Sequence, residues 1–229
     1  DNIKDDSIKK DGSPSQSNKM GTKPVGKLLA SMSAPAIFSM LVNALYNIVD
    51  SVFVSMISQD ALTAVTLAFP IQMLLISLAV GTGVGTNSLI SRRLGARRFD
   101  EANKAAEHSL RIAFLNWGIF FIFGVFFARS YMDAYSNVPF IIENGTIFLQ
   151  IITIGSLFSM IAITIEKTLQ ATGNMILPMI CSLSGAVTNI VLNPILVLGL
   201  LGAPALGVKG AAIATLTGQI LNMVLGLIV

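Results

Sequence analysis

The stretch that decides the fold is LVNALYNIVDSVFVSM, residues 41–56, in which apolar side chains surround one carboxylate, Asp50. No other Asp, Glu, Lys or Arg lies between Lys27 and Asp60. A run of this kind predicts a helix that crosses a bilayer, because about 20 mostly apolar residues span the hydrocarbon core. A charge at that depth costs about 2.5 kcal/mol or more. We therefore interpret Asp50 as a functional residue that faces the interior of a helix bundle.

The composition of the whole chain also indicates a membrane protein. Only 12% of the 229 residues are charged and 53% are hydrophobic, whereas soluble domains carry about 25% charged residues. The net charge of +3 is too small to indicate binding of nucleic acid. The single cysteine, Cys181, cannot form an internal disulfide. It has no partners for a metal site, so we predict neither a resident metal nor a cofactor.

Runs without formal charge divide the chain into six predicted membrane helices. They cover residues 27–57, 68–91, 108–129, 141–168, 176–199 and 208–229. Residues 1–23 are polar, mixed in charge and rich in Ser, Gly and Pro, which predicts a disordered cytoplasmic tail. The predicted fold is therefore all-α, a polytopic membrane domain of six helices within residues 24–229.

The positions of Lys and Arg predict the orientation of these helices. The tail through Lys27 holds six, the second connection holds six more, and the fourth holds Lys167. The opposite side holds only Arg129 and Lys209. Because basic loops stay in the cytoplasm, we expect a multi-pass protein of the cell membrane with its N-terminus inside. The basic second connection needs no other role, although lipid binding or gating remains an alternative.

Small residues and prolines mark two further features of the predicted helices. The segment GTGVGTNS, residues 81–88, lies inside a charge-free span, so we interpret Gly81 and Gly85 as a helix-packing face instead of a phosphate loop. Pro35 and Pro194 fall within spans, where proline removes a helical hydrogen bond. Both predict bends beside a polar interior, and a fixed kink without any gating motion is the alternative.

A set of polar residues in the last helices is predicted to accompany Asp50. Asn189 and Asn193 share one helix face at a spacing of four, as do Thr215 and Gln219. With the N-terminus inside, Asp50, Asn193 and Thr215 all fall in the outer half of the bilayer. Their oxygens suit protons or alkali cations, whereas zinc and copper prefer His and Cys. The alternative is that the amides and hydroxyl only hold helices together.

Removal from water disfavours the charged form of a carboxyl group, and no Lys or Arg lies in the apolar part of any predicted span. A carboxyl group that is neutral part of the time can carry a proton. Glu166 is different, since it adjoins Lys167 at the cytoplasmic end of its span. We interpret these two as an interfacial pair and not as a site.

Four segments, in this order, resemble the multidrug and toxic compound extrusion (MATE) family. They are SMSAPAIFSMLVNALYNIVDSVFVS, GTGVGTNSLISRRLGARRFDEA, LQATGNMILPM and GVKGAAIATLTGQ. The resemblance covers residues 24–229 and implies the N-terminal lobe of a twelve-helix, two-lobe transporter, whose C-terminal lobe is missing from this chain. It further implies export of drugs and other organic cations by antiport against H⁺ or Na⁺.

The resemblance also implies a cation or proton site in this lobe, formed by Asp50, Asn189, Asn193 and Thr215. Asn193 departs from the pattern, because the archaeal members carry a second carboxylate there. With one acid, the resemblance favours coupling to H⁺ and leaves Na⁺ open. It also suggests that the helix of Asp50 bends near Pro35.

A flippase and a membrane enzyme are the alternatives to an efflux transporter. A lipid-linked oligosaccharide flippase of related architecture is the alternative function, but it would need cationic side chains inside the spans for its acidic cargo. A membrane enzyme would need two facing acids or a zinc-binding helix of the HExxH type, and the sequence has neither.

Overall fold

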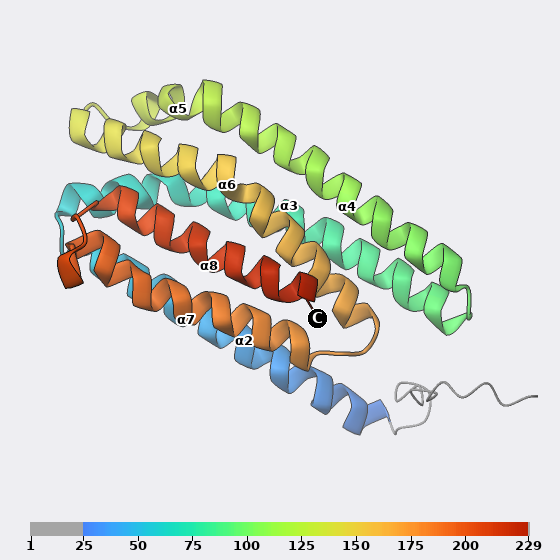
Figure 1. Ribbon diagram of the computed structural model, residues 1–229. Coiled ribbons are helices and arrows are strands. Elements are labelled where there is room, and N and C mark those ends of the chain that lie inside the picture. Colours follow the sequence, from blue (N-terminus) through green and yellow to red (C-terminus); the bar gives the residue numbers. More distant parts are fainter. Residues whose placement is uncertain (1–24, 229) are drawn as a thin grey trace, which may run out of the picture.

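The structure is a computed structural model that describes residues 25–228, and it is entirely helical (Figure 1). The α-helices are α2 (Val25–Ser55), α3 (Gln59–Gly95), α4 (Phe99–Ile122), α5 (Ala128–Tyr135), α6 (Pro139–Ala171), α7 (Ile176–Leu198) and α8 (Val208–Ile228). A π-helical turn, η1 (Phe123–Phe127), joins α4 to α5, and the 3-10 turn η2 (Leu200–Gly202) follows α7. Within the described residues, six helical stretches are long and apolar enough to cross a membrane. The six predicted spans are thus confirmed, whereas the predicted tail, residues 1–23, lies outside the described residues.

Two of the predicted helices are longer than the sequence pattern indicated. The second begins at Gln59 instead of 68 and ends at Gly95, and the third runs from Phe99 to Tyr135 instead of 108–129. Hydropathy identifies only the part of a helix that lies in lipid, whereas backbone hydrogen bonding continues into polar turns. Ser58 begins α3 by accepting a hydrogen bond from the amide of Ala61 at 3.0 Å. This side-chain cap fixes the start of the helix.

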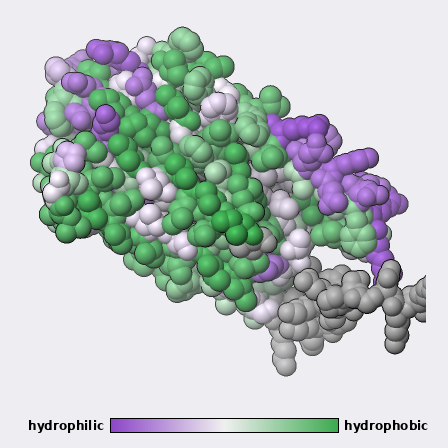
Figure 2. All heavy atoms as spheres, in the orientation of Figure 1, coloured by the Kyte–Doolittle hydropathy of each residue, from purple (hydrophilic) through white to green (hydrophobic). Residues whose placement is uncertain are grey.

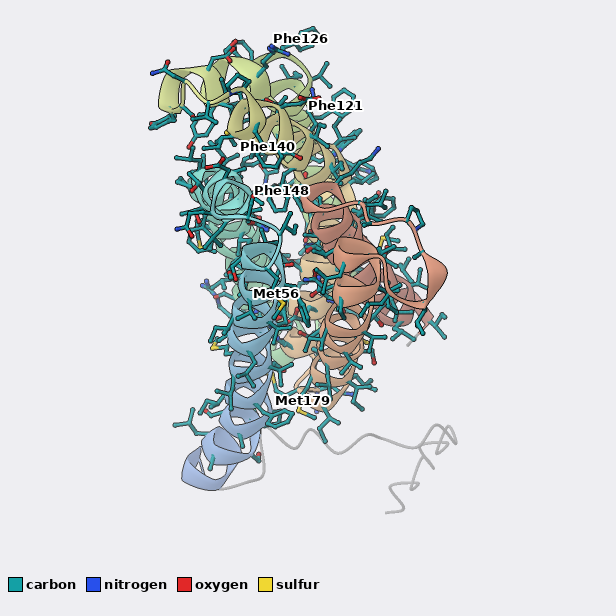
Figure 3. All side chains as sticks on the ribbon, turned by 90° about the vertical axis from the view of Figure 1, so that its left-hand side faces the viewer. Met56, Phe121, Phe126, Phe140, Phe148 and Met179 are labelled. Atoms are coloured by element: carbon teal, nitrogen blue, oxygen red, sulfur yellow. The ribbon has the colours of Figure 1, made fainter. Side chains whose placement is uncertain are left out.

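Helix α6 occupies the centre of the bundle, where it packs against α3, α4 and α8. Helix α8 in turn packs against α7, and α7 packs against α2 (Figure 1). A hydrophobic core with Phe148, Met132 and Val54 fills the end of the bundle where α2 finishes. Figure 3 shows Phe148 among the helices and Phe126 pointing away from them. The helices therefore form one lobe, with α2 attached mainly through α7.

The outer surface of the lobe is apolar along the helices and polar at the ends (Figure 2). Large side chains such as Phe126, Leu115 and Ile119 are mostly exposed on it. The hydrophilic end beyond α3 and α4 carries Arg92, Arg93, Arg97, Arg98 and Lys104. An apolar band between polar ends is the surface that a bilayer requires.

Close helix packing occurs at glycines other than the two that the sequence suggested. A Cβ atom added at Gly81 or Gly85 would meet nothing within 4 Å among the described residues, so the predicted packing face is wrong for this lobe. A Cβ at Gly185 would lie 2.7 Å from the carbonyl oxygen of Gly218, and one at Gly218 would lie 2.6 Å from that of Gly185. Helices α7 and α8 thus approach backbone to backbone at this glycine pair.

Both prolines that were predicted to bend helices lie inside continuous helices, Pro35 in α2 and Pro194 in α7. A third, Pro70, lies inside α3, where the predicted start at residue 68 had placed it in the first turn. Pro194 directly follows Asn193, so the helix lacks one backbone hydrogen bond next to a predicted site residue. Bending at Pro35 and Pro194 remains a prediction.

Candidate cation-coupling site

Asp50 of α2 is paired with Asn193 of α7. The side-chain amide of Asn193 donates a hydrogen bond to the Asp50 carboxylate oxygen Oδ1. Asn193 is fully buried and Asp50 is half-buried. A carboxylate can only accept, so an amide donor matches its ionised form. The structure brings these two residues, which are 143 positions apart, into contact. Their part in cation or proton coupling stays a prediction.

One turn along α7 toward its start, Asn189 makes the second contact of the predicted set. Its side-chain amide donates to the Thr215 hydroxyl of α8 at 3.1 Å, and both residues are buried. The spacing of four residues places Asn189 and Asn193 on the same side of α7. Three helices, α2, α7 and α8, therefore bring all four predicted residues into two adjacent pairs.

Each pair leaves one buried acceptor without a partner. The side-chain oxygens of Asn189 and Asn193 are both shielded from solvent and make no hydrogen bond to the described residues. A buried polar atom without a partner is costly, by about 1–3 kcal/mol. Such atoms are commonly satisfied by a bound water or ion. Carboxylate and amide oxygens are hard donors, the type that suits H₃O⁺, water or an alkali cation.

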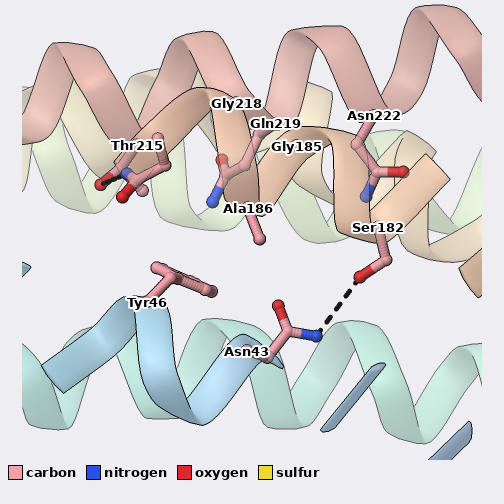
Figure 4. A pocket seen from close by; sticks show the side chains of 10 residues that line it. Asn43, Tyr46, Ser182, Gly185, Ala186, Thr215, Gly218, Gln219 and Asn222 are labelled. Carbon is pink, nitrogen blue, oxygen red and sulfur yellow. Dashed lines mark hydrogen bonds between the residues drawn. The ribbon is translucent and has the colours of Figure 1, made fainter. Parts of the chain in front are cut away.

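A polar cavity adjoins the Asn189–Thr215 pair on the side nearer the start of α7 (Figure 4). Its volume is about 60 Å³, and a single water needs about 10–15 Å³. Figure 4 shows Asn43 of α2 facing Ser182 of α7, and Asn43 donates to the Ser182 hydroxyl at 3.3 Å. Tyr46 of α2 also lines the cavity. The lining is completed by Gly185, Ala186, Asn189, Thr215, Gly218, Gln219 and Asn222. The cavity holds a few waters but is too small for a drug-sized molecule, which needs about 300–1,000 Å³.

Sequence reasoning missed several lining residues, although a signal for them existed. Asn43 precedes Asp50 by seven positions, as Ser182 precedes Asn189 and Thr215 precedes Asn222. Seven residues make about two helical turns, so each pair lies on one face. Each of the three helices thus carries a second polar residue two turns from its predicted site residue, on the same face. This spacing of seven was the signal in the sequence.

Glu166 and Lys167, which were interpreted as an interfacial pair, interact electrostatically and share Gln170 as a hydrogen-bond partner. No ion pair joins them among the described residues; instead Gln170 lies between them. Its amide donates to Glu166 Oε1 at 3.1 Å, while its own oxygen accepts from Lys167 Nζ at 3.1 Å. The Lys167 stem lies against Gly83 of α3.

The Asp50–Asn193 contact yields a test of stability. Replacing Asn193 by Ala should destabilise the protein by about 1.5–3 kcal/mol, the range for hydrogen bonds to charged groups. The loss should be full at high pH, where Asp50 is ionised, and should shrink as the pH falls and Asp50 gains a proton. Thermal unfolding of the purified protein across pH measures this, with exposed Asn103→Ala as the matched control. A loss that does not depend on pH would contradict an ionised Asp50.

The sequence matches the MatE family model over residues 35–195, a range that includes Asp50, Asn189 and Asn193. It is 24% identical over 197 residues to an FAD transporter of Shewanella oneidensis, covering 84% of this chain and 43% of that protein. It is 29% identical over 161 residues to the probable multidrug resistance protein YoeA of Bacillus subtilis, covering 70% of this chain and 35% of that protein.

The fold is similar to that of a solved MOP superfamily transporter from Pyrococcus furiosus. The TM-score is 0.85 at 29% sequence identity, over 93% of this chain and 46% of that one. The chain thus spans less than half the length of each of these three proteins. The shared portion is one lobe of a two-lobe transporter.

Proposed function

The chain belongs to the MatE family, and from that premise we propose that it is the N-terminal lobe of a secondary transporter that exports drugs and organic cations in exchange for H⁺. The observation that carries the proposal is the Asp50 carboxylate, which accepts a hydrogen bond from the Asn193 amide, together with the buried and unpartnered side-chain oxygens of Asn189 and Asn193 on the same side of α7. No Lys or Arg lines the adjoining cavity. An acid without a basic partner inside a membrane lobe is expected to take up a cation.

The choice of H⁺ over Na⁺ rests on the number of acids. A carboxylate and neutral amides supply one negative charge, because Asn193 stands where a second carboxylate would add another. A single carboxyl group is sufficient to carry a proton. Binding of Na⁺ needs a fuller set of charged and neutral oxygens, because these must replace the water molecules around the ion. Na⁺ remains the alternative ion.

The mechanism that we propose begins with protonation of Asp50 from the outer side. The neutral carboxyl group no longer attracts the Asn193 donor as a charge does, and the contact between α2 and α7 weakens. Helix α2 then bends near Pro35 and narrows the space available to the substrate. The membrane potential contributes about 2.3 kcal/mol per charge per 100 mV to inward movement of the proton.

A complete transporter needs a second lobe, since alternating access requires one repeat to rock against another. Helix α2 is exposed over most of its length, with Leu29, Ile37 and Met40 largely uncovered. We propose that the second lobe faces α2 and the adjacent part of α3. The cell membrane is the proposed location, with the basic α3–α4 end and the N-terminus in the cytoplasm.

Export of an anionic nucleotide is the second candidate, because one relative is an FAD transporter. The apolar parts of the predicted spans contain no Lys or Arg, which favours cationic substrates instead, since a diphosphate is normally bound by such groups. The same argument disfavours a flippase for acidic lipid-linked sugars.

Transport by the complete protein in proteoliposomes tests the proposed substrates. With a proton gradient imposed, we expect movement of a fluorescent organic cation well above that of protein-free vesicles, and no movement of FAD. Transport of FAD without transport of the cation would contradict the proposal and support the nucleotide alternative.

A further inference from the structure

Helix α6 directs a second acid, Glu166, toward the inside of the lobe. Ser159 of α6 bonds to Gln219 of α8, and a Cβ on Gly226 of α8 would lie 3.1 Å from Ile165 of α6. Glu166 follows Ser159 by seven residues and therefore lies about two turns farther along the same side. It is also near enough to Cys181 of α7 for an electrostatic interaction. Glu166 thus faces α7 and α8, where the cavity lies.

The charged surroundings of Glu166 are sparse. The Gln170 side-chain amide donates a hydrogen bond to Glu166. The cation beside it is Lys167, whose Nζ donates to the side-chain oxygen of the same Gln170. Helix α7 contributes Cys181, and the adjacent part of α8 contributes no titratable group within the described residues. On the α3 side, Asn87 donates to the Lys167 backbone carbonyl at 2.8 Å. Glu166 is therefore half-buried, interacts electrostatically with Lys167 and forms no salt bridge within the described residues. The transport cycle described above does not use it.

Polar groups lie between Glu166 and Asp50. Asn222 precedes Gly226 by one turn, which places it about 6 Å along α8 from the level of Glu166. From Asn222 and Ser182, the cavity extends through Gln219 to Asn189 and Thr215, next to the Asp50–Asn193 pair. Glu166 itself is five residues from the end of α6, about 7.5 Å along the helix. It therefore lies between the cavity and the aqueous end of the lobe.

We infer that Glu166 is the carboxyl group through which the proton of Asp50 exchanges with the cytoplasm, an inference that rests on the proposed H⁺ coupling. The O–H bond of protonated Asp50 breaks, and its proton passes to water in the cavity. A proton from that water bonds to the Glu166 carboxylate and is then released to water at the end of α6. Asp50 is left ionised and regains the hydrogen bond from Asn193.

This path does not conduct protons continuously. Asp50 is not among the residues that line the cavity, and its carboxylate is bound to Asn193. Transfer therefore requires the Asp50–Asn193 contact to open, which ties proton release to the conformational cycle.

Transport by the complete protein at varied internal pH and fixed external pH tests the role of Glu166. We expect Glu166→Gln to slow proton-coupled transport by about tenfold or more, the scale of losing a positioned proton-transfer group. It should also remove the dependence of the rate on cytoplasmic-side pH. Glu143→Gln, an exposed acid on the same helix, is the matched control and should behave as wild type.

Wild-type dependence on internal pH in Glu166→Gln would overturn the inference. Asp50→Asn in the same assay separates the two proposals. If Asp50→Asn abolishes coupling while Glu166→Gln behaves as wild type, only the inference about Glu166 fails. If both variants behave as wild type, the proposed function fails as well. Should Glu166→Gln not fold, Gln170→Leu keeps the acid but removes its donor and should shift the midpoint of the internal-pH profile. An unshifted midpoint would count against the inference, because a purely structural acid leaves that profile unchanged.

Discussion

Replacing Asp50 by Asn is expected to reduce gradient-driven export by the complete transporter to the rate of protein-free vesicles. The amide is nearly isosteric with the carboxyl group but can neither bind nor release a proton near neutral pH. The substitution also removes a charge from membrane depth, a change that saves about 2.5 kcal/mol or more of insertion cost. The variant should therefore fold and insert at least as well as wild type. Transport and coupling should be lost together while stability is kept.

Uptake of a fluorescent organic cation into proteoliposomes measures this loss, and thermal unfolding of the same preparation measures stability. Asp60→Asn is the matched control, because Asp60 lies exposed in the first turn of α3. The control should transport as wild type does. Export that persists in Asp50→Asn with its pH dependence unchanged would contradict the proposed role of Asp50.

The second large effect is expected at the glycine pair between α7 and α8. In Gly185→Leu, the new Cβ would lie 2.7 Å from the backbone carbonyl oxygen of Gly218, and backbone atoms cannot move aside as a side-chain end can. Overpacking of this kind costs about 1–3 kcal/mol and sometimes more. The two helices would be forced apart at the cavity, so both stability and transport should fall.

Thermal unfolding of the purified protein tests this prediction against Gly118→Leu on α4. A Cβ at Gly118 meets nothing within 4 Å among the described residues. Leucine also favours a helix over glycine by about 0.8–1 kcal/mol, so the control should be neutral or slightly stabilising. Equal stability of the two variants would show that the close approach of α7 and α8 is not needed for folding.

The number of helices and the partners of Asp50 could be predicted because both follow from local patterns. Charge-free runs mark the helices, and the direction of each helix sets the depth of Asp50, Asn193 and Thr215. The helix ends were less predictable, since charge-free runs mark only the apolar part of a helix, whereas α3 begins with the polar residues Gln59 and Asp60. The sequence Ser58-Gln59-Asp60 contains a capping signal for the start of α3. Hydropathy does not report such a signal.

The details of packing could not be read from one sequence. Gly81 and Gly85 have the spacing of a packing motif, yet the close contact forms at Gly185 and Gly218, because it depends on which helices become neighbours. The bond between Asn43 and Ser182 depends on the same arrangement of α2 and α7. Glu166 and Lys167 adjoin in sequence, yet each bonds to Gln170 and no salt bridge joins them among the described residues, which the sequence alone does not indicate.

The exchange of substrate for protons by the complete wild-type transporter tests the central claim most directly. Vesicles loaded with a pH-sensitive dye and an organic cation would be diluted into medium without the cation, first free of Na⁺ and then with Na⁺ added. We predict that efflux moves protons in the opposite direction in the Na⁺-free medium, and that added Na⁺ changes neither flux. Efflux that requires Na⁺ and moves no protons would contradict proton coupling through Asp50.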